Sequence, residues 1–156
     1  MIRIPIPGFG ALALERLVLD YNGTLAVDGK LANGVSERLR ALSARLDIHV
    51  VTADTFGRAR DALAGLPCEL RVLPKPRQDA AKLAYVRRLG ARRCACIGNG
   101  RNDRLMLRAA ALGIAVLLRE GAAAEALRAA DVVCLDIGDA LDLLVHPLRL
   151  VATLRA

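Results

Sequence analysis

The stretch RLVLDYNGTLAVDG, residues 16–29, decides the fold of this 156-residue chain because it joins an apolar strand to a tight turn through a carboxylate. The run 16–20 ends on Asp20, and Asn22-Gly23 then reverses the backbone, since glycine accepts the positive φ that tight turns need. Loop amides of this kind can face an anion. A carboxylate presented there can attack phosphorus and form an aspartyl phosphate, although DYNGT fits a simple D-x-N-G turn equally well.

Beyond this stretch, short β-rich runs alternate with longer segments of helical period, which indicates a parallel sheet covered by helices on both faces. We therefore predict an α/β, three-layer Rossmann-like fold that forms one domain over residues 1–156. The predicted strands are 16–20, 47–52, 69–73, 93–98, 112–118 and 131–135, and the predicted helices lie within 34–46, 55–66, 76–90, 102–113, 120–130 and 137–147. The first dozen residues predict a small β-hairpin at a sheet edge, and LAVDGKLA (25–32) predicts a β-hairpin flap.

Composition excludes several classes of function. The net charge of +7 comes from basic residues scattered along helical segments, and aromatic residues make up only 3%, so nucleic-acid binding is not expected. No stretch has the ~18 apolar residues of a membrane span, and the start lacks the apolar core of a signal peptide, so we expect a cytoplasmic protein. The cysteines form no C-x-x-C pair and are expected to be core thiols: Cys68, Cys94, Cys96 and Cys134.

Polar residues follow the predicted strands, where open parallel sheets bind their ligands. Thr52 stands at the end of the second apolar strand, where its hydroxyl either donates a hydrogen bond to a phosphoryl oxygen or simply caps the next helix. The loop CIGNGRND (96–103) offers Asn99, Asn102 and Asp103 as hard oxygen ligands for Mg²⁺. Two further acids stand at strand ends: Asp54 and Asp136.

Two lysines compete for the role of neutralising a phosphoryl group. Lys75 lies closer to the end of the third strand, but its two flanking prolines favour an extended segment. Lys82 has helical spacing to its apolar neighbours Val86 and Leu89, and we prefer it.

In this order, the four motifs resemble those of the haloacid dehalogenase (HAD) superfamily. That family has a strand-end D-x-D-G-T, a strand-end Thr or Ser, a helical Lys and a G-D-x-x-x-D-type loop. The best match is similar to the phosphorylation domain of P-type ATPases, with DYNGT (20–24), TAD (52–54), Lys82 and GNGRND (98–103) as the counterparts here. Only 31 residues separate Asp20 and Thr52, so the chain resembles a capless member without a nucleotide-binding domain.

The resemblance implies roles for particular residues. Asp20 would be the nucleophile, and Asn22 would stand at the acid/base position. Phosphoryl oxygens would be bound by a set of four residues: Gly23, Thr52, Ala53 and Lys82. The cofactor would be Mg²⁺, with Asp20, the Asn22 backbone carbonyl and Asn99 as ligands. Asp103 would either bind the metal directly or contact its ligands.

Two positions depart from the family pattern. Asn22 replaces the Asp that protonates the leaving group, and its carboxamide cannot carry a proton, so we expect slow hydrolysis of ordinary sugar phosphates. Asn99 replaces a Mg²⁺-binding Asp and removes one negative charge, so we expect weak binding of magnesium.

The sequence therefore predicts a Mg²⁺-dependent phosphohydrolase or phosphotransfer domain. Its expected partner is a small phosphorylated substrate or an activated phosphoryl donor, with neither a membrane nor nucleic acid as partner. The alternative is a catalytically impaired HAD-like module that binds phosphate, nucleotide or a protein. Because capless members of the family often close the site with a neighbouring subunit, a homo-oligomer is also expected.

Overall fold

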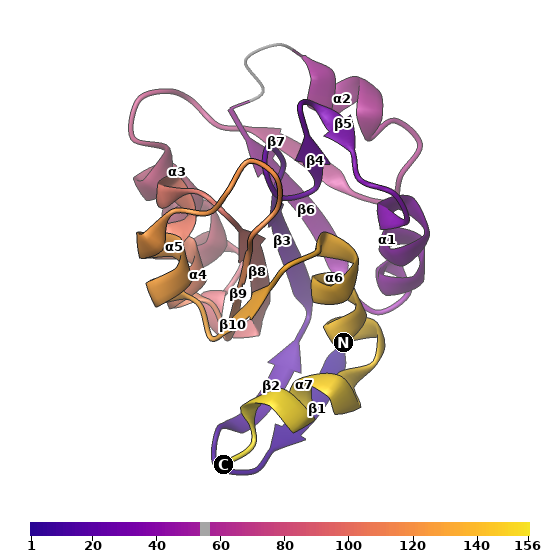
Figure 1. Ribbon diagram of the computed structural model, residues 1–156, viewed down its shortest axis with the longest axis vertical. Helices are drawn as coiled ribbons and strands as arrows, with labels where there is room; N and C mark the ends of the chain where they lie inside the picture. Colours follow the sequence, from indigo (N-terminus) through magenta and orange to yellow (C-terminus); the bar gives the residue numbers. More distant parts are fainter. Residues whose placement is uncertain (54–56) are drawn as a thin grey trace.

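The computed structural model describes residues 1–53 and 57–156, and a six-stranded sheet forms its centre (Figure 1). The strands are β3 (Arg16–Asp20), β6 (Asp47–Thr52), β7 (Glu69–Val72), β8 (Cys94–Gly98), β9 (Leu112–Val116) and β10 (Val132–Cys134). Their spatial order is β10-β9-β8-β3-β6-β7, and every neighbouring pair is parallel. The predicted α/β fold and its six strands are confirmed.

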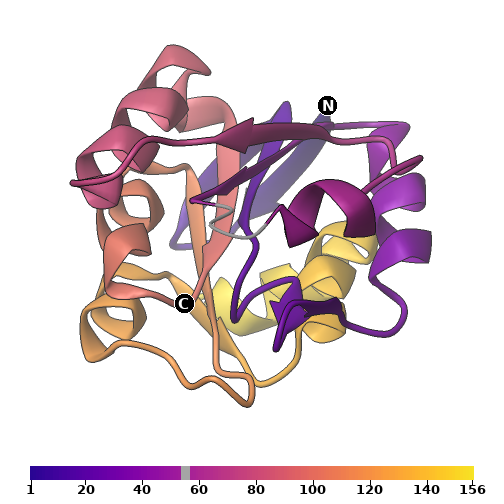
Figure 2. The ribbon, with the colours of Figure 1, turned by 90° about the horizontal axis from the view of Figure 1, so that it is seen from above.

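Helices cover both faces of the sheet (Figures 1 and 2). One face carries α3 (Gln78–Arg88), α4 (Arg104–Ala109) and α5 (Ala124–Ala129). The other face carries α1 (Val35–Ser43), α2 (Arg58–Ala62) and α6 (Ile137–Val145). Two short 3₁₀ segments, η1 (Ala91–Arg93) and η2 (Arg101–Asp103), complete the connections around β8. Each helix that the sequence predicts is present in the described part of the chain, with narrower bounds than predicted.

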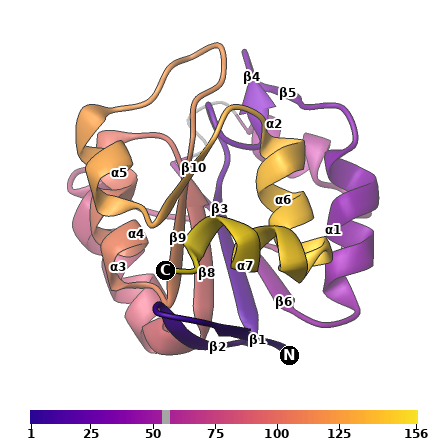
Figure 3. The same ribbon diagram turned by 60° about the horizontal axis from the view of Figure 1, so that its bottom comes forward.

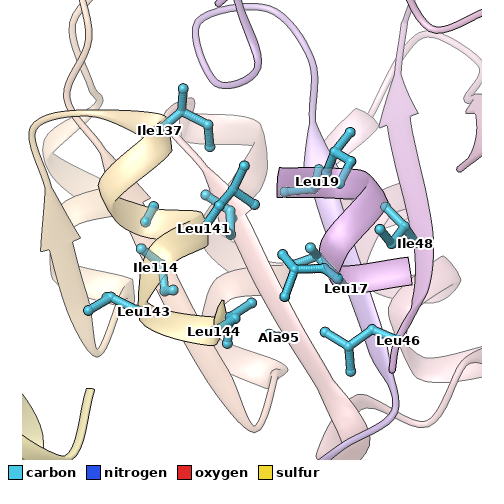
Figure 4. Packing of buried hydrophobic residues seen from close by; sticks show 14 of the residues in the cluster. Leu17, Leu19, Leu46, Ile48, Ala95, Ile114, Ile137, Leu141, Leu143 and Leu144 are labelled. Carbon is cyan, nitrogen blue, oxygen red and sulfur yellow. The ribbon is translucent and has the colours of Figure 1, made fainter. Parts of the chain in front are cut away.

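Successive side chains of β3 point to opposite faces of the sheet. Leu17 and Leu19 point into a large apolar cluster with α1 and α6, in which Figure 4 shows Leu141 and its neighbours. Val18 belongs to a smaller cluster on the α3 and α4 face. Asp20, two residues further along, therefore points toward α3, which places its carboxylate on the same side as Lys82.

The N-terminal hairpin forms, but not at an edge of the main sheet as the sequence predicts. Strands β1 (Ile2–Ile6) and β2 (Gly10–Leu14) pair only with each other, and β2 leads directly into β3 below the sheet (Figure 3). A helix that the sequence analysis did not anticipate, α7 (Pro147–Leu154), lies beside this hairpin. Proline is well suited to the first helical turn because its missing N–H would have no partner there.

The predicted flap is confirmed as a two-stranded hairpin of β4 (Ala26–Val27) and β5 (Lys30–Leu31). Its tip has φ of 52° at Asp28 and 77° at Gly29, as expected for a turn whose two central residues are both left-handed. The Tyr21 hydroxyl donates a 3.1 Å hydrogen bond to the carbonyl of Gly29. The flap is thereby tied to the residue that follows Asp20.

The chain order creates a switch point at the central strand. From β3 the chain passes to β6 and β7 on one side, and then crosses to β8, β9 and β10 on the other. Ligands of open parallel sheets bind at such a point, outside the carboxyl ends of the strands. Asp20 ends β3 there, between Thr52 of β6 and Gly98 of β8.

Candidate functional site

The ammonium group of Lys82 connects two carboxylates at the carboxyl end of β3. Its Nζ lies 2.6 Å from Oδ1 of Asp20 and 2.6 Å from Oδ1 of Asp103. The Lys82 and Asp103 side chains are fully buried, whereas the Asp20 side chain keeps 9% of its surface exposed. Of these three charges, only the carboxylate of Asp20 remains within reach of solvent.

Electrostatics hold this group in an ionised state. Burial lowers the pKa of Lys82, but the carboxylates of Asp20 and Asp103 outweigh it and raise that pKa above its ordinary value. For Asp103, burial and the nearby Asp20 carboxylate raise the pKa to about 6, while the ammonium of Lys82 acts in the opposite direction. Lys82 therefore stays charged, and Asp103 is a weaker acid than an exposed aspartate.

The second oxygen of Asp103 organises the loop after β8. Its Oδ2 accepts hydrogen bonds from the backbone N–H of Asn99 at 3.0 Å and of Gly100 at 2.8 Å. A Cβ at Gly98 would lie 2.5 Å from the Asp103 carboxyl carbon, so the strand must end on glycine for this acid to approach. Both oxygens of Asp103 are thus engaged within the protein, one with Lys82 and one with the loop after β8.

The hydroxyl of Thr24 lies between Asp20 and Asn99. Its Oγ1 is 3.2 Å from Oδ2 of Asp20 and 3.2 Å from Oδ1 of Asn99. The Asn99 amide group donates to the carbonyl of Gly121 at 3.0 Å, so its oxygen is turned toward Thr24 and Asp20. Gly23, at φ 75°, leaves room for this amide, because a Cβ there would lie 2.3 Å from Asn99 Nδ2.

The other predicted site residues near Asp20 differ in how deeply they are buried. Thr52 is buried at the end of β6, one residue beyond Val51, which is the β6 partner of Asp20. Ala53 follows it and is half-buried, and Asp54 lies outside the described residues. Asn22 is exposed beside Asp20, at the position where the family pattern has an acid.

The backbone of Gly23, which the resemblance assigns to phosphate, already has a partner. Its N–H donates to the carbonyl of Ala26 at 2.8 Å within the turn. The carbonyl of Tyr21 accepts three N–H groups of the same turn, those of Thr24, Leu25 and Ala26. The turn is thus closed on itself, and phosphate would have to share the Gly23 N–H with Ala26.

Of the two candidate lysines, Lys82 is the one that contacts Asp20. Lys75 is exposed in the segment between β7 and α3. The helical spacing that favoured Lys82 in the sequence reflects a real helix, α3, whose Val86 packs in the core.

The oxygen donors around Asp20 offer a partial ligand set for Mg²⁺. Among the described residues no three His, Cys, Asp or Glu side chains are grouped as a metal site. A smaller set of hard oxygens does converge, since Oδ2 of Asp20 and Oδ1 of Asn99 both approach the Thr24 hydroxyl. Oxygen ligands of this type suit Mg²⁺, and a single carboxylate among them suits weak binding. The residues therefore fit a weak magnesium site.

Three residues at the site escaped the sequence reasoning. Thr24 was read only as part of the turn, although its place in DYNGT is a usable signal. Tyr21 is buried and anchors the flap, which an apolar-to-polar pattern does not reveal. The carbonyl of Gly121 orients Asn99 from 22 residues away, and no local pattern in the sequence indicates such a contact.

Comparison with known proteins places this geometry among known folds. No family model matches the chain. An uncharacterized protein of Methanocaldococcus jannaschii, MJ0073, is 52% identical over 59 residues, which are 38% of this chain. The chain covers 63% of that relative, less than two thirds of its length.

Solved structures match over most of the chain. The structure of 3-deoxy-D-manno-octulosonate 8-phosphate phosphatase from Moraxella catarrhalis, in complex with magnesium ion, phosphate ion and KDO, has a TM-score of 0.70 at 15% identity, covering 85% of this chain and 86% of that one. A protein described as a HAD superfamily (subfamily III A) hydrolase from Legionella pneumophila has a TM-score of 0.70 at 16% identity, covering 90% and 87%.

The fold is therefore HAD-like, as the order of the motifs implied. The catalytic domain of the CPx-ATPase CopB-B is also similar, with a TM-score of 0.60 at 20% identity over 73% of this chain and 46% of that one. The likeness to a P-type ATPase domain that the motifs suggested thus extends to the fold. None of the helices in the described residues is both long enough and apolar enough to cross a membrane.

Proposed function

We propose that the protein is a Mg²⁺-dependent phosphohydrolase or phosphotransfer domain that acts through an aspartyl phosphate on Asp20. The observation that carries this proposal is the Asp20 carboxylate at the switch point, held by Lys82 and Thr24 while part of it stays exposed. Solved proteins of the same fold, one of them with magnesium and phosphate bound, support it.

In the proposed first step, an Asp20 oxygen forms a bond to phosphorus while the bond between phosphorus and the leaving oxygen breaks. The buried charge of Lys82, together with donors at the ends of β6 and β3, would bind the phosphoryl oxygens; these donors are Thr52, Ala53 and Gly23. Asp103 would keep Lys82 aligned through the 2.6 Å contact. Because this ammonium is already paired and buried, it needs little reorganisation when phosphate arrives.

Magnesium, when bound, would screen the charge between the substrate phosphate and the Asp20 carboxylate. Asp20, the Asn22 carbonyl and Asn99 would hold it. Asp103 would position these groups through its contacts with Lys82 and the Asn99 backbone. Since Asn99 supplies a neutral oxygen, we expect a site that fills only at about millimolar Mg²⁺, which is the weak end of carboxylate sites.

Asn22 limits the reaction that this site can support. Loss of a general acid/base typically costs about 10²- to 10⁴-fold in rate, or about 3 to 5 kcal/mol of transition-state stabilisation. Alkyl phosphates need a proton on the departing oxygen, whereas acyl, aryl and nucleoside diphosphate groups can leave as anions. We therefore expect activated phosphoryl donors to react, and the aspartyl phosphate to hydrolyse slowly.

A second candidate function is a regulatory module that binds phosphate, nucleotide or a protein partner without turnover. Two observations favour it: the exposed Asn22 at the acid position and the neutral Asn99 oxygen beside Asp20. The intact contacts among Asp20, Lys82 and Asp103 favour the enzyme.

The deciding experiment measures turnover of para-nitrophenyl phosphate and acetyl phosphate with Mg²⁺. We expect Asp20→Asn to abolish turnover, and Asn22→Asp to speed hydrolysis of an alkyl phosphate by about 100-fold, within the range for a restored acid/base. The control is Asp47→Asn, an exposed carboxylate at the start of β6, the end of that strand opposite to the site. Equal rates for the unmodified protein and Asp20→Asn would rule out the enzyme and leave the binding module.

A further inference from the structure

A groove of about 720 Å³ lies beside the flap, at the carboxyl ends of β9 and β10. Its apolar lining includes Val27 and Leu31 of the flap, Leu117 and Leu118 after β9, and Leu135 and Ile137 after β10. This volume is within the usual range of small-molecule sites. Its position, outside the carboxyl ends of parallel strands, is also the usual one for ligands in this class of sheet.

The chain segments that build the site around Asp20 lead into the walls of the groove. Asn22 forms an isolated β-bridge with Ala26, and Val27, which follows Ala26, lines the groove. In a second segment, the carbonyl of Gly121 accepts a hydrogen bond from the Asn99 amide group. Residues 117–119, shortly before Gly121 in the chain, line the groove. Two segments that build the site therefore continue directly into the groove walls.

A contact across the groove mouth joins these two walls. The backbone N–H of Asp28, at the flap tip, donates to Oε1 of Glu120 at 2.9 Å. Tyr21 anchors the same tip from inside through the Gly29 carbonyl. The flap is thus tied to the 117–121 loop, and both segments line the groove.

The exposed leucines of the groove suggest that it is covered by an apolar ligand. Leu117 is 40% exposed and Leu135 is 74% exposed, each directly past the end of a strand. The cations Lys30 and Arg119 also line the groove, and neither has an ion pair among the described residues. Of the two acids in the lining, Asp28 and Asp136, the second is already bonded to the first N–H groups of α6.

We propose that this groove binds the leaving group of the substrate, and that this group is a bulky apolar one that departs as an oxyanion: an aryl oxide or a hydrophobic carboxylate. The proposal rests on the proposed function of Asp20. In the reaction, the phosphorus–oxygen bond breaks with its electron pair on the departing oxygen, and Asp20 takes the phosphoryl group. No proton is needed from Asn22, and the positive charges of Lys30 and Arg119 suit the departing anion.

The test compares 1-naphthyl phosphate, which has a large aryl group, with acetyl phosphate, whose acyl group is too small to fill the groove. We expect Leu135→Asp to lower kcat/KM for 1-naphthyl phosphate by about 10-fold, as for a lost apolar contact in a pocket, and to leave acetyl phosphate within about twofold. The matched control is Leu148→Asp on α7, whose leucine is 83% exposed and does not line the groove. Equal losses for both substrates, or equal losses in both variants, would overturn the proposal.

Binding measured without turnover separates this inference from the proposed function. Titration calorimetry should show 1-naphthyl phosphate binding more tightly than inorganic phosphate, and Leu135→Asp should remove the difference. If that difference is present but neither substrate is hydrolysed, the groove assignment stands and the catalytic role of Asp20 fails. If the two ligands bind equally while acetyl phosphate is hydrolysed, the catalytic role stands and the groove assignment is wrong.

Discussion

The two faces of the central sheet are packed with different chemistry. Toward α1 and α6 the buried side chains form one hydrocarbon cluster, which Leu17, Leu19 and Leu141 share (Figure 4). Toward α3 the apolar cluster is smaller, and the same layer contains the buried charges of Lys82 and Asp103. Burying apolar surface stabilises the fold, whereas burying ions carries a desolvation penalty that their attraction only partly offsets.

Charge follows the same division. The helical segments on the α3 face carry seven basic and three acidic residues: Lys82, Arg87, Arg88, Arg101, Arg104, Arg108 and Arg128, with Asp79, Asp103 and Glu125. Those on the opposite face are balanced, with four and four: Arg38, Arg40, Arg58 and Arg60, with Glu37, Asp61, Asp139 and Asp142. One face thus holds the larger buried apolar cluster, and the other carries the excess of positive charge, which would favour the anionic substrate proposed above.

The largest effect should come from removing the buried cation. Lys82→Met leaves the Asp20 and Asp103 carboxylates side by side without a partner, which should lower the free energy of unfolding by about 3–5 kcal/mol and abolish turnover of acetyl phosphate. Urea denaturation and a steady-state assay measure the two effects.

A double variant sharpens this result. Lys82→Met/Asp103→Asn removes one of the two unpaired charges, so part of the lost stability should return while the activity stays absent. If Lys82→Met alone is as stable and as active as the unmodified protein, the two faces do not differ in the way described above.

A cavity on the hydrocarbon face should give a smaller effect that is confined to stability. Leu141→Ala should lower the free energy of unfolding by about 2–5 kcal/mol, since the surrounding side chains only partly fill the space. Below the unfolding temperature, kcat/KM for acetyl phosphate should stay within about twofold, because ΔΔG values at distant sites are usually independent. A large fall in kcat/KM in the folded variant would show that this face also shapes the site.

The smallest effect should be a pH dependence that arises on the polar face. His49 of β6 is buried beside Tyr85 and Glu69, and its Nε2 has no hydrogen-bond partner within residues 1–53 and 57–156. Burial lowers the pKa of His49 below 6.5, against the attraction of Glu69 and Asp47. As pH falls below 6.5, the unfolded chain therefore takes up a proton first, and the folded state loses stability.

This loss should not exceed about 1.4 kcal/mol per pH unit, the value for one proton. His49→Gln, which cannot titrate, should flatten the curve of unfolding free energy between pH 7 and 5. Thermal unfolding across that range is the measurement, and Asp103, with its pKa of about 6, contributes a slope in the opposite direction that both proteins share. Parallel curves for the two proteins would show that His49 titrates in the folded state as it does in the unfolded chain.

Most of the fold was predictable because local patterns carry it. The apolar run that ends on Asp20, the Asp28-Gly29 turn and the helical spacing around Lys82 each gave the correct element. The hairpin was misplaced because its alternation predicts strands but not their neighbours. Helix α7 was missed because Pro147 reads as a stop, although it equally suits the first turn of a new helix.

By itself, the sequence determined which functional groups occur along the chain and in which order. They are a carboxylate and a hydroxyl at strand ends, a lysine on a helix, and a loop with Asn and Asp. Only the tertiary structure decided that Lys82 lies between two acids, that Thr24 joins Asp20 to Asn99, and that Gly121 orients that amide. The physical reason is that these two kinds of information depend on different separations along the chain. Hydrophobic periodicity acts over a few residues, whereas a salt bridge or hydrogen bond between distant segments depends on where the whole sheet places its strand ends.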